Sequence, residues 1–443
     1  MIYAGCAEAS LRGFFYFERK LLKGESAMKE EAFAEVCREA GGKAYVVGGW
    51  VRDTIRGARP KDKDYVVCGL SEEKFQELYP TAERVGKSFP VYLVSIDGKK
   101  CEVAFARRER KTGSGYRGFD IVSSPELTIE EDLYRRDTTI NAAAIELLSN
   151  KIIDPYGARG DIEARIIRPV SEHFGEDPVR ALRAARQSAE LGFSIAPETY
   201  EAMRACGEEI GDEPAERIFN EMVRALRAQH PSVFFRALQK AGLLAKIFPE
   251  LHALIGKTQP IEFHPEGDAF EHIMDVVDKV AAKIPSEMVR FAGLVHDLGK
   301  GVTPEEMLPH HYGHELKGLD VLEAWNSRMT LPKTWYQAAA FVIREHMRAP
   351  RLGKPGKIVS LLLAVDRSPL SASEFKEIIR ADHNTLPDYL ERSEEIIAIL
   401  KKVSGADAPS GCRGKSVGAW ILAEQIRQYR NWRRTGKNTE EAE

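Results

Sequence analysis

The sequence lacks paired cysteines: its six cysteines are scattered over 443 residues, and no two form a C-x-x-C pair. This spacing argues against a zinc ribbon or thioredoxin-type chemistry and is typical of a reduced, cytoplasmic protein. No apolar run approaches the roughly 20 residues of a membrane-spanning helix, which excludes a transmembrane protein. Basic residues are not in excess either, since the chain has 64 Lys and Arg and 67 Asp and Glu, which gives a net charge of −3. Any nucleic-acid binding must therefore come from local patches.

The N-terminus lacks a convincing secretory signal, because the apolar patch at 14–17 is short and is followed at once by charged residues. Residues 1–27 are interpreted as an extension or a misassigned start, and a helix is predicted from 29 to 40. What the sequence does contain is a globular balance of 43% apolar and 30% charged residues. That length and balance predict two to four domains.

Two kinds of pattern divide the chain. Residues 44–105 alternate strand and helix signals, with strands predicted at 44–47, 65–68, 91–94 and 102–105 and a short helix at 50–56. From about residue 178, amphipathic helical segments dominate: 178–191, 195–209, 214–229, 231–242, 272–284, 286–299, 333–346, 388–403 and 415–432. The predicted fold class is therefore α+β, with a small N-terminal α/β head followed by a long all-α body.

A double glycine, Gly48-Gly49, lies between the first predicted strand and the short helix. Glycine lets backbone N–H groups approach an anion closely, and a helix N-terminus favours negative charge. Arg52 follows closely and could hold phosphate. By itself the pattern indicates a phosphate loop or a plain turn about equally, because Gly-Gly turns are common.

Paired carboxylates follow at Asp62 and Asp64, directly before the second predicted strand. Residues i and i+2 of a strand share a face, and two carboxylates held together repel unless a cation lies between them. Oxygen ligands and a triphosphate substrate suit Mg²⁺. Glu102 on a later strand is a candidate third carboxylate. The alternatives are a solvated Asp-Lys-Asp turn and an exposed strand glutamate.

Together these motifs resemble the signature of class II tRNA nucleotidyltransferases and bacterial poly(A) polymerases, members of the polymerase-β-like superfamily. Three further blocks agree in order and spacing: 131–142, 154–161 and 176–186. They resemble the family's ribose-recognition block, the turn after it and the nucleotide-template helix. The match runs through about residue 250. It implies a nucleotidyltransferase head at 41–170, after an extension and leading helix at 1–40, and a helical neck with an RNA-binding region at 171–255.

The chemistry of base selection can be argued from Asp177 and Arg180, which share a helix face at i and i+3. Ionised Asp only accepts hydrogen bonds and Arg only donates them. Cytosine and adenine both present an amine donor beside a ring-nitrogen acceptor, whereas uracil and guanine present the reverse order. A mismatch would leave polar groups unpaired at roughly 1–3 kcal/mol each. The alternatives are a helix cap at Asp177 and a solvated arginine stripe.

The resemblance also implies roles for other residues. Arg136, Arg183 and Arg186 match nucleotide-binding positions, and Asp137 matches a position linked to the ribose 2′-hydroxyl. Two residues depart from the family's pattern: Thr138 stands where Phe or Leu is common, and Gln187 where Phe is frequent. The basic, glycine-rich segment 107–118 resembles the loop of enzymes that add the terminal A, and its length favours complete CCA addition. The alternative is a solvated hairpin.

A second constellation lies in the body at His272, His296, Asp297 and Asp382. Histidine and aspartate together form a mixed nitrogen and oxygen site for a divalent metal. The sequence Gly-Leu-Val-His-Asp-Leu-Gly-Lys around His296-Asp297 resembles an HD-superfamily phosphohydrolase, in which a metal generates hydroxide. The expected metal is Mg²⁺, Ni²⁺ or Mn²⁺. His314 and His346 are further candidates, with ordinary buried histidines slightly favoured. The HD domain is expected at 256–385, before a helical tail at 386–443.

The predicted function is a cytoplasmic CCA tRNA nucleotidyltransferase with an attached HD phosphohydrolase that removes phosphate and opens 2′,3′-cyclic phosphate. The expected partners are tRNA, CTP, ATP and Mg²⁺, with no membrane, and the chain is expected to be a monomer or a homodimer. Arginines 427, 430, 433 and 434 near the end form either a tRNA-phosphate surface or a solvated helix. Rival functions are an A-adding enzyme, a CC-adding enzyme, a poly(A) polymerase, and an inactive RNA-binding module, against which the intact carboxylates argue.

Overall fold

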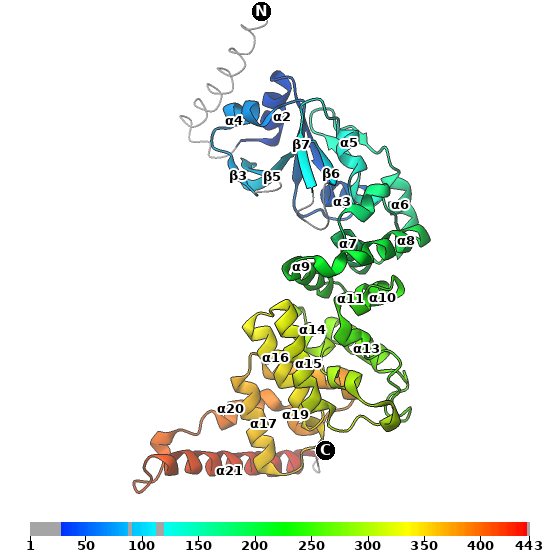
Figure 1. Ribbon diagram of the computed structural model, residues 1–443. Coiled ribbons are helices and arrows are strands. Elements are labelled where there is room, and N and C mark those ends of the chain that lie inside the picture. The colour runs from blue at the N-terminus through cyan, green and yellow to red at the C-terminus, as the bar shows by residue number, and fades with distance from the viewer. Residues whose placement is uncertain (1–27, 87–90, 112–118, 441–443) are drawn as a thin grey trace, which may run out of the picture. The chain divides into compact units, whose positions relative to one another are not determined.

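A computed structural model describes residues 28–86, 91–111 and 119–440. The chain divides into two compact units, with the division between Glu213 and Pro214 (Figure 1). The first unit carries the sheet. The described residues of the second unit form helices and 3-10 turns without a strand of two or more residues. Among the described residues, no helix combines the length and apolar composition needed to cross a bilayer.

The first unit is built on a seven-stranded mixed sheet of order β3-β4-β5-β2-β1-β8-β9. The strands are β1 (Lys43–Val47), β2 (Asp64–Cys68), β3 (Glu83–Val85), β4 (Val91–Ile96), β5 (Lys99–Phe105), β8 (Ala144–Glu146) and β9 (Ile152–Ile153). β2 and β5 pair in parallel, and the other neighbours pair antiparallel. β1 and β2 each bury four of their five residues, as suits Val- and Tyr-rich strands at the centre of a sheet.

The first unit also contains helices. They are α2 (Glu30–Glu39), α3 (Gly49–Ile55), α4 (Glu72–Leu78), α5 (Ile129–Tyr134), α6 (Ala158–Ala164), α7 (Val179–Leu191) and α8 (Pro197–Ala205), with 3-10 turns η1 (Thr139–Asn141) and η2 (Glu172–Glu176) among them. An aromatic cluster joins α2 and α4 to the sheet through Phe33, Phe75 and Tyr92. Such large buried rings contribute much of a small domain's hydrophobic stabilisation.

A separate antiparallel hairpin is formed by β6 (Arg107–Lys111) and β7 (Phe119–Ser123), paired in register from Arg107 with Ser123 to Lys111 with Phe119. The basic segment at 107–118 therefore begins on a hairpin strand. Its remaining residues, 112–118, lie outside the described residues, as does the N-terminal extension 1–27.

The second unit is helical. Its helices are α9 (Ala215–Leu226), α10 (Ser232–Lys240), α11 (Leu244–Ile247), α12 (Pro249–His252), α13 (Ala269–Ala281), α14 (Glu287–Leu294), α15 (His314–Met329), α16 (Lys333–Glu345), α17 (Pro355–Arg367), α18 (Ala372–His383), α19 (Asp388–Glu391), α20 (Ser393–Leu400) and α21 (Lys415–Glu440), with the 3-10 turn η5 (Leu298–Val302). A large apolar core centred on α17 and α18 includes Leu361, Leu362 and Phe375.

The predicted fold class is confirmed, with a mixed-sheet head followed by helices. Three long helices of the second unit, α15, α17 and α18, were not predicted. The segment 388–403 is two helices that meet at Arg392, and the helix predicted at 286–299 ends at Leu294. The residues after Leu294 turn away from the helix into η5, and this turn carries His296 and Asp297.

Candidate active sites in the head and the helical body

The candidate carboxylates of the head lie close together on and before two neighbouring parallel strands, β2 and β5. Asp64 begins β2 and pairs in register with Glu102 of β5, while Asp62 lies in the loop before β2 rather than within the strand. Loss of surrounding water raises the pKa of Asp64, the charges of Glu102 and Asp62 add to this, and Arg136 opposes it. Lys63, between the two aspartates, donates to Glu30 at 2.7 and 2.8 Å. The three acids therefore form one electrostatically coupled group that a cation would relieve.

The double-glycine loop lies directly beside these acids. Gly48 has a φ of +70° and precedes α3. A Cβ atom placed on Gly48 would lie 3.4 Å from Arg136 Nη1 and 4.0 Å from Asp64 Oδ2. Arg52 is held by a two-point contact to Asp53 at 3.0 and 3.1 Å, and it donates to Asn141 at 3.0 Å. The phosphate-loop candidates Gly48, Gly49 and Arg52 are thus gathered at the carboxylate edge.

Asp137 and Thr138, from the predicted ribose-recognition block, contact side chains of α7. Asp137 is 5% exposed and accepts hydrogen bonds from Arg183 Nε at 2.7 Å and Gln187 Nε2 at 3.1 Å. Although burial acts in the opposite direction, the Arg183 guanidinium holds the pKa of Asp137 well below its usual range. Gln187 also accepts a hydrogen bond of 2.7 Å from Thr138. The two residues that depart from the family pattern therefore contact each other and Asp137.

The start of α7 carries the base-selection candidates. Asp177 lies just before the helix and accepts from the backbone N–H of Val179 at 3.1 Å, so it also serves as a cap. Arg180 is only 8% exposed and donates to the carbonyl of His173, and Arg186 is 4% exposed and pairs with Glu190. The solvated-stripe alternative is therefore wrong for Arg180 and Arg186.

The four histidine and aspartate candidates of the body converge on one buried centre. His272 Nε2 lies 3.0 Å from Asp382 Oδ1, and His296 Nε2 lies 3.2 Å from Asp297 Oδ2. All four side chains are 5% exposed or less. His296 Nε2, Oδ1 of Asp297 and Oδ2 of Asp382 are buried without a hydrogen-bond partner in the structure. Buried polar atoms are rarely left in this state, and nitrogen and carboxylate atoms aimed at one point fit a divalent metal.

The charged groups of this centre shift one another's pKa values. Although burial acts in the opposite direction, the Asp297 and Asp382 carboxylates raise the pKa of His296 to about 10. The charge of His296 in turn holds the pKa of both aspartates well below their usual range. Lys300 contributes a further cation 2.5 Å from Asp297 Oδ2. Opposite charges are thus concentrated in a space closed to water, which is frequent at active sites.

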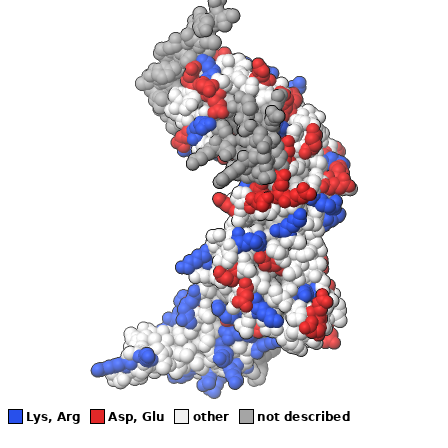
Figure 2. Space-filling view, viewed as in Figure 1, with Lys and Arg blue, Asp and Glu red and all other residues white. Residues whose placement is uncertain are grey.

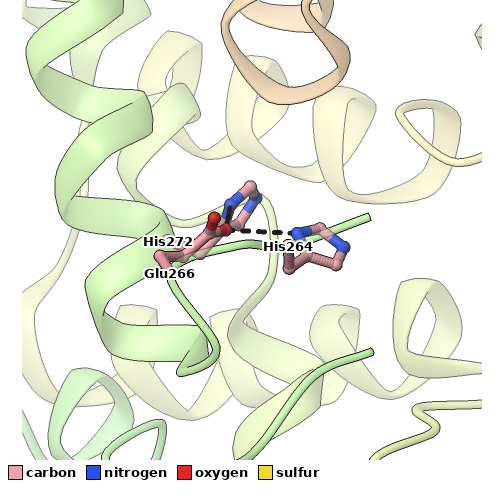
Figure 3. A group of neighbouring side chains, drawn as sticks. All are labelled: His264, Glu266 and His272. Carbon is pink, nitrogen blue, oxygen red and sulfur yellow. Dashed lines mark hydrogen bonds and ion pairs between the residues drawn. The ribbon is translucent and has the colours of Figure 1, made fainter. Parts of the chain in front are cut away.

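Glu266 and His264 lie beside His272, as Figure 3 shows. His272 Nδ1 donates to Glu266 Oε1 at 2.5 Å, and His264 Nδ1 lies 3.2 Å from the same oxygen. Although burial opposes it, the bond from His272 lowers the pKa of Glu266 to about 2. A carboxylate that holds one ring nitrogen of histidine turns the other toward a metal. Glu266 was not predicted, because it lies in a loop without periodic signal.

His314 and His346 also lie in this centre. His314 Nε2 is 3.1 Å and His346 Nε2 is 3.3 Å from Asp297 Oδ1, and both rings are buried. Both histidines therefore lie beside the His296-Asp297 pair, and their roles stay a prediction. The sequence signal was only their residue type.

Family models match three parts of the chain. The family model described as "Poly A polymerase head domain" matches residues 44–168, "Probable RNA and SrmB- binding site of polymerase A" matches 192–255, and "HD domain" matches 269–408. Among solved structures, the CCA-adding enzyme of Bacillus stearothermophilus in complex with CTP is 24% identical with a TM-score of 0.59, and the match covers 91% of each chain. A tRNA nucleotidyltransferase complexed with a primer tRNA and an ATP analogue is 23% identical with a TM-score of 0.56, covering 84% of this chain and 98% of that one.

Fold and sites thus define a nucleotidyltransferase-type head joined to an HD-type helical domain. A multifunctional CCA protein of Nitrosospira multiformis is 43% identical over 357 residues, which is 79% of this chain and 85% of the relative. Another, of Nitrosococcus oceani, is 44% identical over 403 residues, covering 87% and 96%. The chain belongs to the family of multifunctional CCA proteins.

Proposed function

We propose that this protein adds C, C and A to the 3′ end of tRNA from CTP and ATP without a nucleic-acid template. In each step the tRNA 3′ oxygen bonds to the α-phosphorus of the nucleotide, the bond to the pyrophosphate oxygen breaks, and the hydroxyl proton is lost. The observation that carries the proposal is the register of Asp64 with Glu102, beside Gly48 and Arg136. It gathers acid ligands and anion-binding groups at one place.

The acids Asp62, Asp64 and Glu102 would hold Mg²⁺, the ion best suited to carboxylate oxygens and phosphates. Bound there, Mg²⁺ supplies charge neutralisation to the triphosphate and makes the attacking hydroxyl more acidic. The N–H groups of Gly48 and Gly49 and the side chains of Arg52 and Arg136 bind and orient the triphosphate.

Asp137, Arg183 and Arg186 bind the nucleoside side of the substrate, and Asp177 with Arg180 selects the base. Support comes from the 2.7 Å bond between Asp137 and Arg183, which fixes both groups before nucleotide binds. Cytosine and adenine offer a donor to Asp177 and an acceptor to Arg180, and the reversed edges of uracil and guanine leave both unpaired. Fixed protein groups would thus replace a template base.

The helical body is proposed to hydrolyse phosphate esters at the same RNA end, including a 2′,3′-cyclic phosphate. His272, His296, Asp297 and Asp382 would hold a divalent metal such as Ni²⁺ or Mn²⁺, which supplies hydroxide near neutral pH when bound. The four converging side chains and their unpartnered atoms support this assignment.

We propose tRNA as the shared partner. Exposed basic side chains on α21 and the segments before it include Arg413, Lys415, Arg430, Arg433 and Arg434. Figure 2 shows Lys and Arg gathered on the visible face of this C-terminal region. Such a patch attracts the phosphate backbone even when the net charge is slightly negative.

Reciprocal substitutions test both activities in the full-length protein. Asp64→Asn should reduce nucleotide incorporation by at least 100-fold, because metal charge neutralisation is worth several kcal/mol, and should spare cyclic-phosphate hydrolysis. His296→Gln should do the opposite. Incorporation is read from tRNA length and hydrolysis from phosphate release.

Asp97→Asn is the matched control, because Asp97 is an exposed turn residue of the same unit. Wild-type incorporation by Asp64→Asn would refute the proposed head site, and wild-type hydrolysis by His296→Gln would refute the proposed body site.

A further inference from the structure

The lysine between the two proposed metal acids of the head is bound by the leading helix α2. Lys63 Nζ donates to both carboxylate oxygens of Glu30, at 2.7 and 2.8 Å, and Glu30 is the first residue of α2. The Tyr65 hydroxyl donates to the same carboxylate at 2.6 Å. The side chains of Lys63 and Glu30 are only 25% and 24% exposed, so solvent and salt screen this pair less than a pair at the open surface.

Lys63 also contacts the double-glycine loop. Its Nζ atom lies 4.7 Å from the centroid of the Trp50 ring, and Trp50 directly follows Gly48-Gly49 in α3. An ammonium group over an indole ring is attracted by the electrons of the ring face. One side chain therefore joins α2, the segment before β2 and the start of α3.

The segment that carries Asp62 has few other ties. Among the described residues, none of residues 59–63 forms a backbone–backbone hydrogen bond. The flanking residues do, since the N–H of Ala58 bonds to the carbonyl of Asp53, and Asp64 pairs with Val47 in the sheet. The contacts of Lys63 are therefore well placed to fix this stretch of backbone.

The direction in which Lys63 is held matters for its neighbours. Successive side chains of an extended chain point to opposite faces, so residues 63 and 65 share one face. Lys63 and Tyr65 both contact Glu30, and Asp64 between them pairs in register with Glu102. Holding residue 63 on the side of Glu30 therefore turns the adjacent carboxylates toward the other side, where the acids gather.

Glu30 is presented by a firmly packed helix. Phe33, one turn further along α2, is fully buried, and its ring packs against those of Tyr65 and Phe75 at 5.7 and 6.5 Å. The Tyr79 hydroxyl donates to the carbonyl of Phe33 at 2.9 Å. The match to the head family model begins only at residue 44, so α2 lies before it.

We propose that Glu30 is a positioning residue of the nucleotidyltransferase head, which acts through Lys63 to fix Asp62 and Asp64 for Mg²⁺. Helix α2 is then a working part of the head rather than an appended segment. The inference deepens the proposed function and rests on Asp62 and Asp64 being metal ligands.

Glu30→Gln in the full-length protein tests the proposal, because it removes the charge of the pair and keeps the size of the side chain. The Mg²⁺ concentration for half-maximal nucleotide incorporation should rise about 10-fold, as for residues that orient metal ligands. The kcat at saturating Mg²⁺ should change little, since Glu30 is not proposed to touch substrate.

Metal binding gives a second measurement that does not depend on turnover. Equilibrium dialysis with Mn²⁺ and CTP, without tRNA, counts the bound ions, and the ions of the head are those lost in Asp64→Asn. Their affinity should fall in Glu30→Gln by the same factor as the Mg²⁺ requirement rises.

The matched control is Glu31→Gln, because Glu31 is the next residue of α2, is exposed and loses the same charge. It should behave like the wild type. Lys63→Met should show the same loss as Glu30→Gln, and the double variant should show no further loss, because all three remove one interaction. If thermal unfolding shows that Glu30→Gln is not folded, Lys63→Met still decides, since it leaves α2 unchanged.

Wild-type Mn²⁺ affinity and a wild-type Mg²⁺ requirement in Glu30→Gln would overturn the proposal. So would a double variant in which the two losses add, or one in which Lys63→Met restores the affinity lost in Glu30→Gln. Normal Mn²⁺ binding and incorporation in Asp64→Asn would instead refute the proposed metal site of the head. Loss of both in Asp64→Asn, with a normal Glu30→Gln, would refute the role of Glu30 alone.

Discussion

At the scale of single residues, the candidate sites are set by partners that the sequence does not place together. Arg183 was predicted to bind nucleotide, but its contact with Asp137 could not be read from a separation of 46 residues. Thr138 and Gln187 were noticed only as departures from the family pattern. The structure makes them a buried pair that contacts Asp137, with a 2.7 Å bond between them.

We expect Gln187→Leu to lower the free energy of unfolding by about 1–3 kcal/mol, because the Thr138 hydroxyl and one bond of Asp137 lose a buried partner. The KM for CTP and ATP should rise more than kcat falls, since Asp137 is proposed to bind ribose rather than to react. Denaturant unfolding and steady-state kinetics measure both effects.

Thr138→Val combined with Gln187→Leu should be less destabilising than the sum of the single variants, because replacing both partners by apolar groups leaves fewer polar atoms unpaired. Unchanged stability and unchanged KM in Gln187→Leu would contradict a positioning role.

At the scale of elements, periodic patterns predicted most of the framework but missed α15, α17 and α18. The strands at 44–47 and 65–68 and the helix at 178–191 are confirmed to within a residue or two. Helix α15 was missed because its buried stripe, His314, Gly318, Leu322, Trp325 and Met329, contains a histidine and a glycine. His314 lies beside Asp297, and Gly318 lets η5 approach α15 closely, so neither residue contributes an apolar side chain to the helical pattern.

The parallel pairing of β2 with β5 could not be predicted either, because strand order depends on tertiary packing rather than on local pattern. Glu102 was therefore only one of several strand glutamates until its register with Asp64 was known.

Gly299→Ala tests the close contact of η5 with α15. The added methyl group would lie 2.0 Å from the His314 carbonyl, so the two elements must separate. We expect a destabilisation of about 1–3 kcal/mol or more, as overpacking usually produces, together with weaker metal binding in the body. Thermal unfolding and Mn²⁺ titration measure these effects.

Gly353→Ala is the matched control, because its Cβ atom would meet no heavy atom within 4 Å and it lies in the same unit. A Gly299→Ala protein as stable as this control, with unchanged metal affinity, would show that the close approach is dispensable.

At the scale of the whole molecule, one chain carries two candidate metal sites, which we propose act on the same RNA end. The head has acids and arginines suited to building the end, and the body has a histidine-rich centre suited to removing phosphate from it. The family of the chain and its domain order followed from motifs, because each motif is a short run in sequence. The convergence of four histidines and two aspartates in the body did not follow, since these residues are spread from 272 to 382.

The most direct test of the central claim uses a tRNA transcript that ends at the discriminator base. The wild-type protein is incubated with Mg²⁺ and CTP, ATP or both, and product length is read at single-nucleotide resolution. We predict two additions with CTP alone and a third only when ATP is also present. Stopping after CC, adding A only to a CC-ended transcript, or making a long poly(A) tail would contradict complete CCA addition.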